Sequence, residues 1–214
     1  MSLICPKCGA YALDNTERSP NSTKCAACNS ITPVNIFPLF VVTGASGSGK
    51  STVVGELRCQ LPEFIVFDSD LLWGRTGDHY HNNWLRIAYS IAQGGRYILI
   101  CGTLMPWDLD ACEDRGLVGT IHFLNLHCSD EIREQRLRAR PAGRNSASED
   151  FINEHRRFAH WLIVNASVKY DPPMVTVDTS SKSVREVAQE IAQWVLGRVG
   201  GKVRGEAVGD SSAA

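Results

Sequence analysis

Gly44-Ala45-Ser46-Gly47-Ser48-Gly49-Lys50-Ser51 follows an apolar run at residues 39–42 and opens a segment with the spacing of a helix. The stretch fits the pattern G-x-x-x-x-G-K-[ST] in the strand-then-helix setting that its mechanism requires. Its glycines let successive backbone N–H groups turn inward, and the helix adds unpaired first-turn N–H groups and the positive end of its dipole. We expect Lys50 to reach the β- and γ-phosphates of a nucleotide and Ser51 to coordinate Mg²⁺, with Thr52 also contacting the nucleotide. The stretch predicts a nucleoside triphosphate site; a Gly/Ser-rich surface loop is the alternative.

The composition is that of an ordinary globular protein. The chain has 214 residues and a formal net charge of −1. This length suits one α/β domain with a small appendage, and the charge balance argues against a general attraction to nucleic acid or membranes. No apolar stretch approaches the roughly 20 residues that span a bilayer, and residues 1–5 lack the features of a signal peptide. We therefore expect a cytoplasmic protein with no membrane partner.

Four of the eight cysteines form two C-x-x-C pairs near the N-terminus, namely Cys5, Cys8, Cys25 and Cys28. Each pair can point two thiolates at one ion, and two pairs complete a tetrahedral Zn²⁺ site. So short a segment has little core of its own, so metal binding would supply its folding energy. The spacing predicts a structural zinc ribbon; a redox dithiol pair and chance are the alternatives. The ribbon has few basic residues, which favours a bracing or protein-docking role over nucleic-acid binding.

Apolar runs and helical spacings alternate along the rest of the chain. Strands are expected at residues 39–43, 64–67, 97–101, 120–126 and 174–177, and helices at 50–61, around 84–91, after Ser129, after Ser148 and at 183–197. This alternation predicts an α/β fold, a three-layer sandwich whose central parallel sheet of about five strands is covered on both faces. The expected domains are a zinc ribbon at 1–35, the α/β domain at 36–197 and a disordered tail at 198–214.

Two carboxylates, Asp68 and Asp70, directly follow the second expected strand. Ligands of an open parallel sheet bind beyond the carboxyl ends of its strands, so we expect this pair to lie beside the loop at residues 44–51. Asp68 is assigned to Mg²⁺, and Asp70 is assigned to the proton of an attacking hydroxyl. A turn or helix cap after the strand is the alternative, and for Asp68 both interpretations can hold.

The glycine loop together with a D-x-D pair resembles the P-loop small-molecule kinases of the nucleoside-monophosphate-kinase group. Phe67-Asp68-Ser69-Asp70, with Arg75-Thr76-Gly77 downstream, is similar to the shikimate-kinase stretch. The wider layout is similar to chloramphenicol phosphotransferase and the tunicamycin-resistance protein. The resemblance covers residues 39–197, and it implies the P-loop NTPase fold and transfer of a phosphate from ATP with Mg²⁺.

The resemblance also indicates where an acceptor would bind. In these kinases the acceptor-binding segment follows the D-x-D pair, which here gives Trp73 and Arg75 as candidates beside Asp70. P-loop ATPases and GTPases usually end the third strand with an Asp, whereas this chain has Cys101, which disfavours the motor and switch classes. Shikimate kinase places glycines there against its acceptor, so Gly102 and Thr103 are expected to line the acceptor pocket. The N-K-x-D guanine signature is absent from the sequence, which favours ATP as the donor.

Arginines recur on one face of the helix after Ser129, at positions 133, 136 and 140. A Pro/Gly/Asn/Ser stretch follows, as in a kinase lid, and a solvated basic face is the alternative. In the family, lid arginines stack on adenine and clamp the transferring phosphoryl group. The resemblance therefore implies Arg136 near adenine and Arg140 near the phosphates, with Arg144 as a further candidate. It also implies that Asp178 and Thr179, after the last strand, wrap the adenine.

Together these patterns predict an ATP- and Mg²⁺-dependent kinase that phosphorylates a hydroxyl of a small molecule. Lys50, Asp70 and Arg140 are the expected catalytic residues. A nucleoside, a sugar, a shikimate-like acid and an antibiotic all fit as the acceptor. Two alternatives stay open: a polynucleotide 5′-hydroxyl kinase that docks through the ribbon, and a non-catalytic, ATP-binding regulatory protein.

Overall fold

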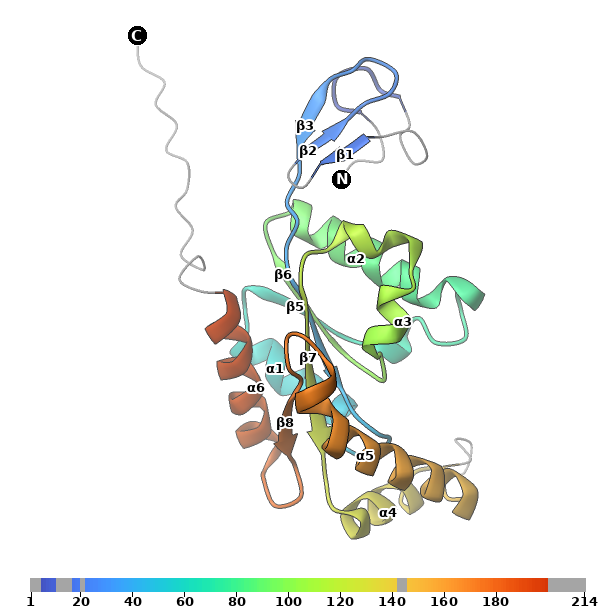
Figure 1. Ribbon diagram of the computed structural model, residues 1–214. Coiled ribbons are helices and arrows are strands. Elements are labelled where there is room, and N and C mark those ends of the chain that lie inside the picture. The colour runs from blue at the N-terminus through green and yellow to red at the C-terminus, as the bar shows by residue number, and fades with distance from the viewer. Residues whose placement is uncertain (1–4, 11–16, 20–21, 142–145, 200–214) are drawn as a thin grey trace.

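A computed structural model describes residues 5–10, 17–19, 22–141 and 146–199 (Figure 1). Its main domain is built on a five-stranded parallel sheet with the order β5-β6-β4-β7-β8. These strands are β4 (Leu39–Thr43), β5 (Phe64–Asp68), β6 (Tyr97–Cys101), β7 (Ile121–His127) and β8 (Val175–Asp178). The expected tail beyond residue 199 and the candidate Arg144 lie outside the described residues.

Helices cover both faces of the sheet. Helices α1 (Lys50–Gln60) and α6 (Val184–Val199) pack on one face, at the left of Figure 1. Helices α2 (Tyr80–Gln93), α3 (Pro106–Asp110) and α5 (Glu149–Lys169) pack on the other. Helix α4 (Asp130–Arg138) follows β7, and three short 3-10 helices, η1 (Ser69–Leu71), η2 (Gly77–His79) and η3 (Glu113–Leu117), complete the domain. The predicted three-layer fold is confirmed.

The central strand β4 shows why this sequence forms a buried parallel sheet. Successive side chains of a strand point to opposite faces, so Phe40 and Val42 enter the core beneath α1 and α6. Leu39 and Val41 enter the core beneath α2 and α5. All four side chains are fully buried, as expected for a strand that is apolar on both faces.

The strand order, which was not predicted from the sequence, separates β5 from β4. The second predicted strand, β5, does not neighbour β4, because β6 lies between them and pairs with both. The carboxyl ends of all five strands nevertheless meet at one edge, and Asp68 stands directly opposite Cys101 of β6. The D-x-D pair therefore shares an edge with the glycine loop, and the residues after β6 separate the two.

The N-terminal ribbon contains an antiparallel sheet of β1 (Glu17–Ser19), β2 (Ser22–Lys24) and β3 (Ile31–Pro33). Asn35 fixes the connection to the main domain, because its backbone N–H donates to Gln93 and its side-chain amide donates to the carbonyl of Ala92 at the end of α2. The chain then enters β4 at its amino end. The ribbon consequently lies at the opposite end of the sheet from the loop that follows β4 (Figure 1). The proposed boundary at residue 35 stays a prediction.

Serine caps begin helices α4, α5 and α6. The Ser129 hydroxyl accepts from the N–H of Ile132 at the start of α4, and the Ser148 hydroxyl accepts from Phe151 at the start of α5. Ser183 and Glu186 form the predicted capping box of α6. Across the described part of the chain, none of the helices combines the length and the apolar character that crossing a bilayer demands.

Leu99 and Leu196 offer a matched test of the core. Leu99 on β6 is 0% exposed and Leu196 on α6 is 45% exposed. We expect Leu99→Ala to lower the free energy of unfolding by about 2–5 kcal/mol, because it removes buried methyl groups and leaves a cavity. Leu196→Ala should cost below about 1 kcal/mol. Urea denaturation followed by circular dichroism measures both, and equal losses would contradict the packing described here.

Candidate functional site

A cavity of about 430 Å³ runs along the carboxyl edge of the sheet. It is lined by the glycine loop and the start of α1, the two carboxylates after β5, the residues after β6, the end of α4 and the segment between β8 and α6. The lining residues are Ser46, Gly47, Gly49, Lys50, Ser51, Thr52, Val53, Asp68, Asp70, Gly102, Thr103, Arg136, Ala139, Arg140, Thr179, Lys182, Val184 and Val187. Most residues predicted for the site from the sequence thus face one cavity.

Two glycines of the loop are required by their positive φ angles and by the close approach of neighbouring elements to the loop backbone. Gly44 has φ 143°, and a Cβ at this position would collide with the carbonyl oxygen of Leu126 on β7. Gly47 has φ 85°, and a Cβ there would lie 3.1 Å from the Cγ of Arg133. Any side chain at either position would push the loop off β7 and α4. The loop therefore needs glycine at both positions to stay seated against these elements.

Lys50 is partly buried at the start of α1. Its Nζ donates to the carbonyl oxygens of Gly44 and Ala45 at 2.6 and 3.0 Å, so the side chain curls over the loop. Burial and the nearby Arg140 lower the pKa of Lys50 to about 8, and the carboxylates of Asp70 and Asp68 oppose this shift. Lys50 therefore lies within electrostatic reach of both Arg140 and the carboxylate pair.

Asp68 and Asp70 form a tight turn at the end of β5. The Oδ1 of Asp68 accepts from the N–H of Asp70 at 2.9 Å, so Asp68 caps η1 while it also lines the cavity. The Tyr80 hydroxyl donates to the carbonyl of Ser69 at 3.0 Å and holds the turn to α2. A Cβ on Gly102 would overlap the Ser69 side chain, so glycine after β6 lets this turn pack beside the sheet. The helix-cap alternative for Asp68 is confirmed, alongside its place in the cavity.

Arg136 joins three segments at the other end of the cavity. Its guanidinium donates to the carbonyl of Gly47 and to both the hydroxyl and the carbonyl of Thr179, at 3.0–3.2 Å. The Thr179 hydroxyl in turn donates to the carbonyl of Ser48 at 3.0 Å. Arg136 and Thr179 therefore lie together against the loop, and their contact with adenine stays a prediction.

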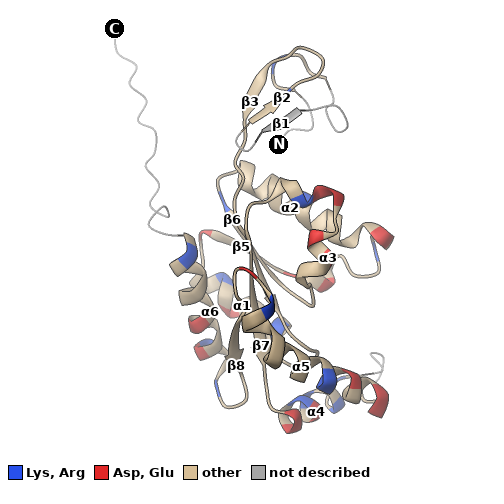
Figure 2. Cartoon of the chain, viewed as in Figure 1, with Lys and Arg blue, Asp and Glu red and all other residues tan. Residues whose placement is uncertain are grey.

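The three arginines of α4 have different surroundings, although they share a face. Arg133 is 1% exposed, and it donates to the carbonyl of Cys128 at 2.7 Å. Arg136 and Arg140 are partly buried and line the cavity. The alternative of a solvated basic face is therefore wrong for this face. The exposed Arg138 instead pairs with Glu134 and Glu149 and ties α4 to α5. Figure 2 shows that acidic and basic residues alternate along α4 and α5.

Six residues predicted for the nucleotide or acceptor site lie outside the cavity lining, namely Gly44, Ala45 and Ser48 of the glycine loop, and Trp73, Arg75 and Asp178. Trp73 is 70% exposed and stands edge-on to Tyr80, and Arg75 is also exposed. Both follow η1, which turns this segment outward. Asp178 accepts from the N–H of Ser180 at 2.6 Å and shapes the turn after β8. The structure therefore does not bring the side chains of Trp73, Arg75 and Asp178 into the cavity.

The structure adds cavity residues that sequence reasoning missed. Lys182, Val184 and Val187 close the cavity near Thr179, and Lys182 pairs with Glu190 of α6. These residues follow the carboxyl end of the last strand, directly before or within the last helix. That position in the sequence could have indicated that they lie at the cavity. His155 of α5, interpreted from the sequence as structural, accepts from the backbone N–H of Ser46 at 3.3 Å and so contacts the loop.

The four ribbon cysteines fit a zinc ion. Their sulfur atoms all lie within 4.8 Å of one another, and the Cys5–Cys28 and Cys8–Cys25 pairs are 3.7 and 3.8 Å apart. Tetrahedral Zn²⁺ with Zn–S bonds of about 2.3 Å requires sulfurs about 3.8 Å apart. Ser30 lies 3.4 Å from Cys5 and 3.1 Å from Cys28, and its hydrogen bonds lower the pKa of both thiols, that of Cys5 to about 6. This donor set suits Zn²⁺.

Comparison with solved structures identifies the fold. A sugar kinase from Janibacter sp. HTCC2649 has a TM-score of 0.51 and 16% identity over 75% of this chain and 94% of its own. The tunicamycin resistance protein of Deinococcus radiodurans gives 0.52 and 18%, over 74% and 95%. A gluconokinase from Sinorhizobium meliloti 1021 gives 0.50 and 19%, over 77% and 94%. The main domain has the fold of the P-loop kinases. No family model and no curated protein matches the sequence.

Removal of one ribbon thiol tests whether the four cysteines bind zinc and whether that site is independent of nucleotide binding in the cavity. We expect Cys25→Ser to lose bound zinc, because a tetrahedral site needs all four ligands, and to leave nucleotide affinity within about twofold because the ribbon lies at the other end of the sheet. Cys59→Ser, at an exposed cysteine of α1, should keep about one zinc per chain. Atomic absorption and nucleotide titration measure these effects. Unchanged zinc content in Cys25→Ser would refute the four-cysteine site.

Proposed function

We propose that the chain is an ATP- and Mg²⁺-dependent kinase that transfers the γ-phosphate to a hydroxyl of a small molecule. One observation carries the proposal: a single cavity is lined by the glycine loop with Lys50, by Arg136 and Arg140, and by the carboxylates of Asp68 and Asp70. The glycine loop, Lys50 and the two arginines suit the binding of a triphosphate. A carboxylate in the same cavity suits the activation of an attacking hydroxyl. The fold shared with a sugar kinase and a gluconokinase agrees with this assignment.

The proposed nucleotide lies along the loop. The apolar side chains of Ala139, Val184 and Val187, with the guanidinium of Arg136, would enclose the adenine at the β8 end of the cavity. The backbone N–H groups of residues 46–51 and Lys50 would hold the β- and γ-phosphates. Ser51 and Asp68 would hold Mg²⁺, which supplies charge neutralisation at the phosphates when bound. Oxygen donors of this kind are the ones that Mg²⁺ prefers.

Asp70 is the proposed general base. Its carboxylate would accept the proton of the acceptor hydroxyl as that oxygen forms its bond to the γ-phosphorus, while the bond from phosphorus to the ADP oxygen breaks. Lys50 and Arg140 would offset the charge on the transferring group. Thus the positioning of two substrates in one cavity, rather than covalent catalysis, would supply most of the rate enhancement.

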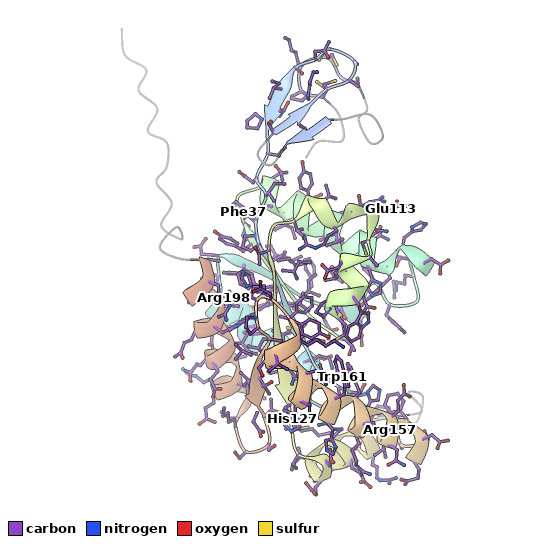
Figure 3. All side chains as sticks on the ribbon, in the orientation of Figure 1. Phe37, Glu113, His127, Arg157, Trp161 and Arg198 are labelled. Carbon is purple, nitrogen blue, oxygen red and sulfur yellow. The ribbon has the colours of Figure 1, made fainter. Side chains whose placement is uncertain are left out.

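The place of the ribbon bears on the polynucleotide alternative. The ribbon joins the amino end of β4 (Figure 1), whereas the cavity lies beyond the carboxyl end of that strand, so the described residues of the ribbon do not flank the cavity of their own chain. Figure 3 labels a residue at each end of the sheet: Phe37 lies before β4, and His127 is the last residue of β7. A bracing or protein-docking role for the ribbon therefore belongs to the proposal. ATP use and reduced zinc ligands suit the cytoplasm, which we propose as the location.

Asp70→Asn tests the proposed base. We expect phosphate transfer to fall about 10²–10⁴-fold, because an amide cannot accept the proton, with nucleotide affinity within about threefold. Asp78→Asn, at an exposed aspartate of η2 outside the cavity, is the matched control and should retain full activity. An ATP-consumption screen over nucleosides, sugars and antibiotics measures both variants. Unchanged activity in Asp70→Asn would remove Asp70 from the mechanism.

Substitutions at two arginines of α4 distinguish a direct effect on nucleotide binding from an effect on the stability of the helix. Arg136→Ala should weaken ATP binding by about tenfold or more, since it removes a charged contact at the adenine end. Arg138→Ala, two residues along the same helix but outside the cavity, should change ATP binding by less than about twofold. Isothermal titration with ATP and Mg²⁺ gives both values. Equal losses would show that Arg136 acts through the stability of the helix alone.

A further inference from the structure

One peptide unit of the glycine loop is held from both sides. The carbonyl of Ala45 accepts from the Nζ of Lys50 at 3.0 Å and from the N–H of Ser48 at 3.3 Å. The N–H of the same unit, on Ser46, donates to the Nδ1 of His155 at 3.3 Å. Because the carbonyl and the N–H of a trans peptide point in opposite directions, these contacts together fix the plane of the unit.

His155 reaches the loop from outside the cavity. It stands on α5, and it is not one of the residues that line the cavity. The imidazole is half-buried, and it packs edge-on against the ring of Phe151, one turn earlier on the helix, with the ring centroids 4.3 Å apart. The packing of the ring on α5 therefore orients Nδ1 toward the loop.

The contact requires one protonation state of His155. An imidazole that accepts at Nδ1 is neutral and carries its proton on Nε2. Burial and the charge of Lys50 lower the pKa of His155. Arg133 and Arg140 add to this shift, and the neighbouring Glu154 opposes it. The surroundings of His155 therefore favour the neutral form that the contact needs.

His155 contributes an acceptor to the loop, whereas two other side chains contribute donors. Arg136 donates to the carbonyl of Gly47, and Thr179 donates to the carbonyl of Ser48. These donors cannot satisfy the N–H of Ser46. A partly buried N–H without an acceptor is costly, so loss of the imidazole would favour rotation of the Ala45–Ser46 peptide.

The contact gains importance when a nucleotide binds. In the proposed function, Lys50 turns from the carbonyls of Gly44 and Ala45 to the phosphates. The carbonyl of Ala45 then loses one of its two donors. The hydrogen bond to His155 is made on the other side of the peptide, so it continues to fix the peptide plane while Lys50 is engaged.

We propose that His155 is a positioning residue of the nucleotide site, which keeps the Ala45–Ser46 peptide in the orientation that the loop needs to bind phosphates. This inference rests on the proposed nucleotide site. His155 acts through the loop, because it does not line the cavity. Loss of a single hydrogen bond to the loop should weaken ATP binding about three- to tenfold.

Three substitutions at position 155 separate the hydrogen bond from the space that the ring fills. His155→Asn keeps an acceptor in place, because the amide oxygen of asparagine and the Nδ1 of histidine are both bonded to Cγ. His155→Gln carries its oxygen one bond further out, and His155→Leu has no acceptor. His160→Leu is the control, because the exposed His160 lies on the same helix but pairs with Asp130 of α4.

Isothermal titration of the full-length proteins with ATP and Mg²⁺ measures the effect. We expect affinity to fall about three- to tenfold in His155→Leu and His155→Gln, and to stay within about twofold of wild type in His155→Asn and His160→Leu. Wild-type affinity in His155→Leu, or an equal loss in His155→Asn, would overturn the inference and leave the kinase proposal standing. No ATP binding by the wild-type protein would overturn the proposed function, and the inference with it.

The tautomer of His155 gives a second readout, which does not depend on how well a variant folds. Wild-type protein labelled with ¹⁵N in its histidines is examined by long-range ¹H–¹⁵N NMR at about pH 7.5, above the usual pKa of histidine. The signal of His155 is the one that is missing in His155→Asn. We expect a proton on Nε2 and none on Nδ1. A proton on Nδ1 would overturn the inference.

Discussion

The close seating of the loop between β4 and α1 against β7 and α4 is the constraint on which the rest of the site depends. Gly44 approaches the backbone of Leu126 with no room for a Cβ, and a Cβ on Gly47 would crowd Arg133. Because the loop is held this closely, Arg136 can reach the carbonyl of Gly47 from α4, and Thr179 can reach Ser48 from beyond β8. Backbone contact with three elements thus gives the cavity its shape.

The sequence predicted the elements well, because the central strands are apolar on both faces. Helices α4, α5 and α6 also carry serine caps that act over three residues. It did not predict the strand order, since nothing local in residues 64–68 shows that β6 inserts between β5 and β4. Helix α3 has five residues and was missed, because its spacing is too short to show a period. Local sequence patterns therefore predict individual helices and strands more reliably than they predict which strands lie next to each other.

The residues of the site were likewise predicted best where their position depends on local sequence. Residues placed by a strand end or by the loop itself, such as Asp70, Thr103 and Lys50, line the cavity. Trp73 and Arg75 were assigned by resemblance to a segment whose direction depends on the 3-10 turn at η1, and they face outward. The burial of Arg133 depends on how α4 packs against the loop. Helical spacing shows that Arg133, Arg136 and Arg140 share a face of the helix, but it does not show how deeply each side chain is buried.

The central claim is that the loop and the carboxylate pair serve one reaction. A crystal structure with Mg²⁺ and a non-hydrolysable ATP analogue tests it most directly through the distance from the Asp70 carboxylate to the γ-phosphorus. An attacking oxygen about 3–3.5 Å from phosphorus and a hydrogen bond of about 3 Å to Asp70 predict a separation of roughly 5–6 Å, with open space between the two groups. A γ-phosphate more than about 10 Å from Asp70, or one shielded from it by protein, would contradict the account.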